Sequence, residues 1–206
     1  MANIITAGNS TNGGTAISTD TSGTLNIVVG SGSGTTAMSI DASGNVAGVL
    51  KSGTAKAYNW NGLTTNTSID FTDIPSTVKR ITVIFNEVST NGSSNIILQV
   101  GAGSVTTSGY VSTYFGVSGT TGQTNSSNLG IIVFNGAASY VTSGFIQFVN
   151  ISGNTWIASG SYKGTTSTAN SSAGSIALSG TLDRVRITTV SGTDTFDAGS
   201  INILYE

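Results

Sequence analysis

The chain has 206 residues, a formal net charge of −2 and only 8% charged residues, so it offers no basic surface to attract nucleic acid or anionic lipid. It contains neither Cys nor His, which excludes disulfides, thiol nucleophiles, Cys/His zinc sites and the commonest general base. Gly, Ser, Thr and Asn make up 109 residues, but 15 aromatic side chains and many Ile and Val residues indicate a folded protein.

The first residues, MANIITAGNS, lack the basic start and apolar core of a signal peptide. Every apolar run is far shorter than the roughly 18 residues that would span a bilayer. We therefore expect a soluble chain without membrane insertion.

Strand signals follow one another along the chain. Short apolar or alternating runs occur in TLNIVV, AMSI, KRITVIF, NIILQV, GIIVF, GFIQFVNI, TWIAS, RVRITTV and INILYE. Pro75 lies in the turn DIPST, and the segments NGSSN, SGTTGQTNSSN, ISGNTW and VSGTDTFDAG carry the Gly and Asn typical of turns. No stretch shows the 3.6-residue period of a helix. The sequence predicts an all-β protein.

The composition changes near residue 53. Residues 1–52 contain no aromatic side chain and only short apolar runs, so they cannot build a core of useful size. They are predicted to form an extended N-terminal arm with two short strand-turn units, the second turning at residues 41–45. Residues 53–206 hold all 15 aromatics and about ten strand candidates, which favours an antiparallel β-sandwich head, jelly-roll-like in its size and spacing.

Two strands carry apolar residues on both faces. Ile81, Val83 and Phe85 share one face of their strand while Ile84 lies on the other, and the run 145–151 is partly apolar on both faces. A sheet packed on one side only should alternate cleanly, so the second face is expected to be covered. A partner subunit and long loops are both suitable covers.

Two pairs of carboxylates are candidates for acid–base chemistry. Asp70 with Asp73, and Asp194 with Asp197, could serve a glycoside hydrolase or bind calcium. Both pairs lie where a strand meets a turn, where Asp commonly caps the backbone, and neither resembles a dense calcium loop. Serine lacks a His to activate it, which leaves only a Ser–Lys dyad formally open. We predict no enzyme, and we assign no catalytic, metal or cofactor-binding residue.

Arginines and aromatics are the candidate binding residues. Arg184 and Arg186 alternate with Val185 and Ile187, so they share a face that is solvated, contacts another subunit or clamps an acidic sugar. Aromatic residues inside strand runs are expected in the core: Phe71, Phe85, Phe145, Phe148 and Trp156. Tyrosines near polar segments are candidate receptor contacts, with half-buried packing as the alternative role: Tyr110, Tyr114, Tyr140 and Tyr162.

Two long segments resemble the C-terminal domains of tailed-bacteriophage tail fibres and related virion surface proteins. They are residues 68–104, SIDFTDIPSTVKRITVIFNEVSTNGSSNIILQVGAGS, and residues 180–206, GTLDRVRITTVSGTDTFDAGSINILYE. The resemblance rests on the aspartate and Phe71, on Ile74-Pro75, on Lys79-Arg80-Ile81 and on residues 194–200, DTFDAGS. The arm segment ISTDTSGTLNIVVGSGSGTTAMSIDASGNV is similar to the thread-like shafts that precede such domains.

The resemblance implies a homotrimer on the virion surface, assembled in the host cytoplasm. Its arm, residues 1–52, would attach to other virion proteins, and its head, residues 53–206, would bind a host surface glycan or protein without catalysis. Because only about 50 residues precede the head, a short tail fibre fits the length, and so does a head fibre or a capsid decoration protein. A depolymerising tailspike fits less well, since such enzymes need a long repetitive scaffold and a carboxylate cleft. The family transfers no catalytic residue.

Overall fold

The computed structural model describes residues 66–118, 120–164 and 168–206, together with Ser43 and four short strands nearer the N-terminus. The chain divides into two compact units, Met1–Lys51 and Ser52–Glu206. The role of the first unit as an attachment arm stays a prediction.

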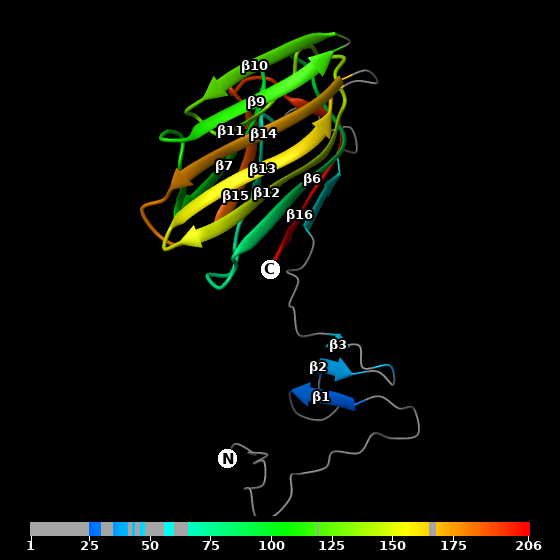
Figure 1. Ribbon diagram of the computed structural model, residues 1–206, viewed down its shortest axis with the longest axis vertical. Helices are drawn as coiled ribbons and strands as arrows, with labels where there is room; N and C mark the ends of the chain where they lie inside the picture. The colour runs from blue at the N-terminus through cyan, green and yellow to red at the C-terminus, as the bar shows by residue number, and fades with distance from the viewer. Residues whose placement is uncertain are drawn as a thin grey trace, which may run out of the picture. The chain divides into compact units, whose positions relative to one another are not determined.

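The first unit contains a three-stranded antiparallel sheet in the order β1-β2-β3 (Figure 1). Its strands are β1 (Leu25–Val29), β2 (Thr35–Ile40) and β3 (Val46–Ala47). β1 pairs with β2 from Leu25 opposite Ile40, and Ser43 lies in the turn that joins β2 to β3. The strands follow the two strand-turn units expected from the sequence.

The second unit is an antiparallel β-sandwich, as the sequence predicted (Figure 1). The larger sheet has eight strands in the order β10-β9-β14-β13-β12-β6-β16-β4. The smaller sheet has five strands: β11-β7-β15-β5 in that order, with β8 paired to β7. Among the described residues the structure contains no helix, and so none long and apolar enough to cross a membrane.

The strand bounds are as follows. In the larger sheet they are β4 (Lys56–Asn59), β6 (Arg80–Thr90), β9 (Val111–Ser118), β10 (Thr121–Ser127), β12 (Thr142–Ser152), β13 (Thr155–Lys163), β14 (Thr168–Ala177) and β16 (Phe196–Tyr205). In the smaller sheet they are β5 (Ser68–Phe71), β7 (Ile96–Ala102), β8 (Ser104–Val105), β11 (Ile131–Val133) and β15 (Arg184–Thr189).

The core lies between the two sheets and follows the alternation along each strand. In β6, Ile81, Val83 and Phe85 are buried while Ile84 faces outward, as predicted. The smaller sheet contributes an equally apolar inner face, whose fully buried members are Ile96, Leu98, Val100, Ile131, Val133, Val185 and Ile187. These side chains are all aliphatic and β-branched or leucine, which suits the close packing of two pleated surfaces.

The prediction of a turn for the segment SGTTGQTNSSN is wrong, because this segment contains strand β10. β10 pairs along its whole length with β9, from Thr121 opposite Ser118 to Ser127 opposite Ser112. It is the edge strand of the larger sheet, and six of its seven residues are exposed. A strand that buries neither face carries no hydrophobic period, so no strand signal is visible in this part of the sequence.

Candidate functional site

The four candidate tyrosines do not form a common exposed surface. Tyr110, Tyr114 and Tyr162 are buried, and Tyr140 is half-buried. Three of the four rings therefore pack inside the sandwich and cannot stack on a saccharide, which corrects the expectation of receptor contact for them. The alternation of side chains along a strand explains this. Tyr114 in β9 and Tyr162 in β13 lie at inward positions, and Tyr110, directly before β9, is buried as well.

The Tyr110 hydroxyl is bonded to the smaller sheet. It accepts a hydrogen bond from the Val100 backbone N–H at 2.7 Å, and the Val100 and Thr106 carbonyl oxygens both lie 3.1 Å away as acceptors for its proton. Burial raises the pKa of Tyr110 to about 12, although its bond with the Val100 backbone acts in the opposite direction. This tyrosine joins the start of β9 to β7 and serves the fold.

Tyr162 and Tyr114 also join separate parts of the fold. The Tyr162 hydroxyl accepts a bond from the Phe134 N–H at 2.9 Å and shares one of 3.0 Å with Ser172, whose hydroxyl donates to the Ile132 carbonyl. The Tyr114 ring stacks on Phe134 with 4.9 Å between ring centroids, and Phe134 meets the edge of Tyr140 at 5.6 Å. These contacts hold the segment after β11 against the larger sheet.

The carboxylates of both acidic pairs bind neighbouring parts of the fold. Asp70 lies directly opposite Arg186 on paired strands and forms two parallel hydrogen bonds with it, of 2.7 and 2.8 Å. Asp194 accepts from the Ser94 N–H at 2.9 Å, Asp197 accepts from the Ser89 hydroxyl, and Asp73 accepts from Thr72. The carboxylates thus bind other parts of the fold, whereas the sequence led us to expect that they would cap the adjacent backbone.

Both arginines of β15 already have a carboxylate partner. Arg186 binds Asp70, and Arg184 binds Asp183 through two hydrogen bonds of 2.7 and 3.1 Å. The guanidinium group lowers the pKa of Asp183, which also accepts from the Gly103 N–H. Since each arginine fork is occupied by a carboxylate of the same chain, an acidic sugar would have to displace one of these pairs.

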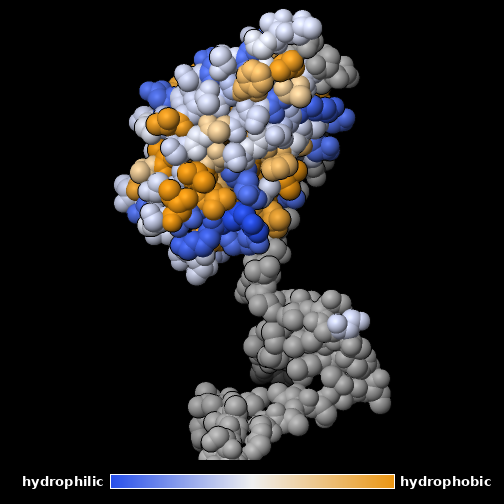
Figure 2. All heavy atoms as spheres, viewed as in Figure 1, coloured by the Kyte–Doolittle hydropathy of each residue, from blue (hydrophilic) through white to orange (hydrophobic). Residues whose placement is uncertain are grey.

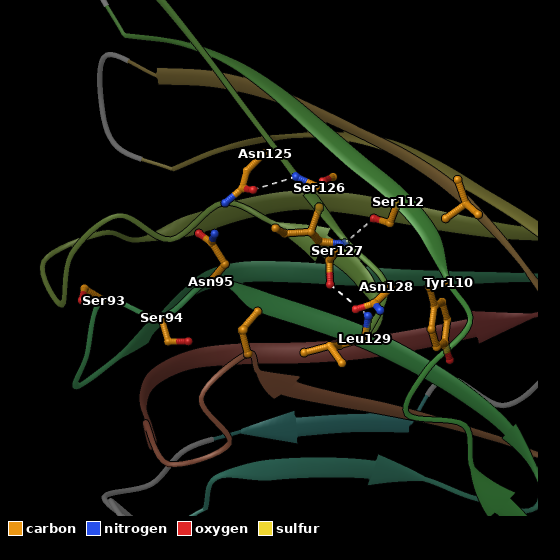
Figure 3. Close-up of a pocket in the computed structure, with 13 residues that line it drawn as sticks. Ser93, Ser94, Asn95, Tyr110, Ser112, Asn125, Ser126, Ser127, Asn128 and Leu129 are labelled. Atoms are coloured by element: carbon orange, nitrogen blue, oxygen red, sulfur yellow. Dashed lines mark hydrogen bonds between the residues drawn. The ribbon is translucent and has the colours of Figure 1, made fainter.

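A pocket at one end of the sandwich was missed by the sequence reasoning (Figure 3). Five segments line it: residues 93–95 between β6 and β7, residues 110–112 at the start of β9, residues 125–129 at and after the end of β10, Ile132 in β11 and Val190 after β15. Its volume is about 670 Å³, which is within the roughly 300–1,000 Å³ of small-molecule sites. We call it the end pocket.

The walls of the end pocket are fixed by hydrogen bonds to the backbone. The Ser112 hydroxyl accepts from the Ile132 N–H at 2.9 Å, and the Ser127 hydroxyl accepts from the Leu129 N–H at 3.1 Å. The Asn95 side-chain oxygen accepts from the Asn135 N–H at 2.8 Å, and the Ser94 hydroxyl accepts from the Ser191 N–H at 2.9 Å. Every one of these bonds joins segments that are separate in the chain or closes a tight loop, so the pocket is built by the fold.

The lining of the end pocket is polar but uncharged. None of the residues that line it is Asp, Glu, Lys or Arg, and most are Ser or Asn. Val111, Leu129 and Val190 add exposed apolar surface. Such a surface can exchange hydrogen bonds with a neutral polar ligand but has no charge with which to activate a nucleophile or hold a metal ion.

A second surface of interest is the outer face of the larger sheet, where exposed apolar residues lie among polar ones (Figure 2). Phe145 was expected in the core, and that expectation is wrong, because its side chain is 47% exposed on this face. It lies directly opposite Ile84, which is 38% exposed, and Phe115 on the same face is 56% exposed. The other four aromatic residues that were predicted for the core are buried in it.

No three His, Cys, Asp or Glu side chains gather into a metal-binding group within residues 66–206 as the structure describes them. Comparison of the chain with protein-family models, with curated proteins and with solved structures finds no match.

Proposed function

We propose that this chain is a structural protein of a bacteriophage virion, a short tail-fibre-like homotrimer that binds a host surface receptor without catalysis. Its first unit would attach to other virion proteins, and its sandwich would contact the host. The proposal rests on the sequence resemblance of residues 68–104 and 180–206, and on the way these two segments come together in the fold.

The observation that carries the proposal is that the two resembling segments form one paired framework. β5 pairs with β15, β7 pairs with β15, and β6 pairs with β16, so three ladders join segments about one hundred residues apart. The backbone groups of Arg80 and Glu206 exchange two hydrogen bonds of 2.9 Å, and their side chains form an ion pair. The residues that carry the resemblance therefore specify a scaffold, as motifs shared by proteins with different receptors should.

Receptor binding without catalysis is supported by the roles of the carboxylates. Asp194 and Asp197, the pair that could have served a hydrolase, bind Ser94 and Ser89 of the framework. A glycosidase would need two carboxyl groups facing a substrate cleft, with one kept protonated. We expect the purified protein to release no reducing ends from host polysaccharide.

The experiment that tests the proposal is gold labelling of intact particles with an antibody against residues 53–206, viewed by electron microscopy. Label at the tail is the expected result. Label over the capsid would replace the fibre with a head fibre or a decoration protein, and unlabelled particles would overturn both. A particle lacking the gene serves as the control for antibody specificity.

The role assigned to the first unit has a test of its own. Deletion of residues 1–51 follows the division between the two units and leaves the sandwich strands from β4 onward intact. We expect the truncated protein to keep the β signal of the full chain in circular dichroism but to be absent from particles. Incorporation of the truncated protein into particles would contradict an attachment role for residues 1–51.

A further inference from the structure

Five polar side-chain groups in the end pocket form no hydrogen bond within the part of the chain that the structure describes. They are the side-chain amide nitrogens of Asn95 and Asn125, the hydroxyls of Ser93 and Ser126, and the Asn128 amide, none of which forms a hydrogen bond with another part of the chain that the structure describes. Other lining groups, such as the Ser112 and Ser127 hydroxyls, already accept hydrogen bonds from backbone N–H groups. The pocket thus combines a fixed wall with a set of donors and acceptors that remain available.

The charge around the end pocket selects against an anionic ligand. Asp194 lies directly behind the wall, because its carboxylate accepts the Ser94 N–H at 2.9 Å and the Ser191 hydroxyl at 3.2 Å. No Lys or Arg lines the pocket to offset that charge. A ligand carboxylate or phosphate placed there would lose its hydration without gaining a cation.

The apolar part of the lining fits a ligand whose two faces differ. Val111 is 73% exposed, Val190 is 42% exposed and Leu129 is 36% exposed at the rim of the pocket. A sugar ring presents C–H groups on its faces and hydroxyls around its edge. It would contact the aliphatic side chains with its face and the Ser and Asn groups with its edge, which would satisfy both kinds of surface.

We propose that the end pocket binds a neutral saccharide unit of the host surface. This inference rests on the proposed function, which places the saccharide on the host surface. It adds that the receptor is a glycan and that the end pocket is the surface that contacts it. Ser93, Ser126 and Asn128 are the contact residues that the fold uses least. A protein receptor, the other class of partner, is an outcome that the following experiment separates.

The test is binding of the full-length protein to an array of bacterial surface glycans, divided into neutral oligosaccharides and those bearing uronate, sialic acid or phosphate. The pocket variant is the double substitution Ser93→Ala with Asn128→Ala, which removes two available groups and no hydrogen bond within the described chain. The matched control is Ser76→Ala with Thr77→Ala, since both residues are exposed in the turn before β6, lie outside the pocket and form no side-chain hydrogen bond within the described chain. Circular dichroism checks that both variants fold.

We expect binding to neutral glycans that falls by roughly ten-fold or more in the pocket variant and is unchanged in the control. Binding only to anionic glycans, equal binding by the pocket variant, or capture of a host protein with no glycan bound would each overturn the inference. If gold label is found at the tail while no neutral glycan binds, the proposed function stands and this inference fails. If glycan binding depends on the pocket but particles carry no label, the pocket chemistry holds and the fibre proposal fails.

Discussion

Tyr110 shows how much a single polar atom contributes when it is buried. Its hydroxyl satisfies the Val100 N–H, and Val100 itself is completely buried in β7. A buried N–H that loses its acceptor costs more than the bond itself contributes, because the group has no water to replace the partner. The residue that looked like a receptor contact in the sequence is a structural link between the sheets.

The substitution Tyr110→Phe should therefore lower the free energy of unfolding by about 1–3 kcal/mol. Urea unfolding followed by tryptophan fluorescence measures the change. Tyr140→Phe is the matched control, since this ring is half-buried and its hydroxyl forms no hydrogen bond within the described chain. We expect the control to stay within about 0.5 kcal/mol of the parent. Equal stability of the two variants would mean that the Val100 N–H has another acceptor.

The same buried hydroxyls predict a loss of stability at alkaline pH. Burial raises the pKa of Tyr110 from 10.0 to about 12 and also raises the pKa of Tyr162. A raised folded-state pKa means that the unfolded chain releases its proton first, so the contribution is complete below pH 10 and declines as the pH rises toward 12. The urea concentration at the unfolding midpoint should be lower at pH 11.5 than at pH 9, and the decrease should be smaller in Tyr110→Phe. A midpoint that falls equally in both proteins would assign the effect to other groups.

At the scale of the strand, the β6–β16 ladder contains a bulge whose backbone has little freedom. The register shifts on both sides of Ala198, Gly199 has a φ of +89° and Glu87 has a φ of +53°. A Cβ at Gly199 would lie 2.3 Å from the Glu87 carbonyl oxygen, so only glycine fits there. The bulge belongs to DTFDAGS, a string on which the resemblance to fibre heads rests, and the fold accounts for its glycine.

Gly199→Ala should destabilise the sandwich by about 2–4 kcal/mol, because it combines an unfavourable φ with a clash against backbone. Gly153→Ala is the matched control. Gly153 also has a positive φ, of +50°, but a Cβ there would meet nothing within 4 Å, so its cost should stay near the 1–2 kcal/mol of the left-handed conformation alone. Thermal or urea unfolding of the two variants measures the difference. Equal losses would contradict the steric part of the argument.

Strands with apolar runs could be predicted from the sequence, and strands that bury small polar residues could not. β6, β7, β12, β15 and β16 all contain apolar runs that the period identified. β14 presents Thr168, Asn170 and Ser172 to the interior, so the alternation between its faces is invisible to hydrophobicity. β14 adopts the strand conformation because β13 and β9 pair with it along nearly its whole length.

The candidate site was less predictable than the fold for a compositional reason. The end pocket is lined mostly by Ser and Asn, and Gly, Ser, Thr and Asn account for 109 of the 206 residues, so no lining residue stands out. What distinguishes Asn128 from other asparagines is an available amide beside a shaped cavity, and that depends on segments distant in the chain. Tyrosine did stand out in the sequence, but the face of the strand on which each ring lies decided its role.

At the scale of the molecule, the outer face of the larger sheet is unusual for an isolated chain. One row across seven strands runs through Asn202, Ile84, Phe145, Ser161, Ser171, Phe115 and Thr124, and none of these residues is charged. Wide sheet surfaces of soluble monomers normally carry dispersed charge, which keeps them apart in solution. A sheet face that exposes Ile and Phe within an uncharged row is typical of a surface that another subunit covers.

We therefore predict that the homotrimer forms through this face, centred on the pair Ile84 and Phe145. Light scattering of the full chain at micromolar concentration should give three times the 20.7 kDa of one chain. The double substitution Ile84→Ser with Phe145→Ser should reduce the mass to that of one chain while the β signal persists, because both side chains already contact solvent in the isolated sandwich. Val190→Ser, at 42% exposure and outside this row, should remain trimeric. A parent mass of 20.7 kDa would overturn the trimer itself, whereas a trimeric double variant would move the interface away from β6 and β12.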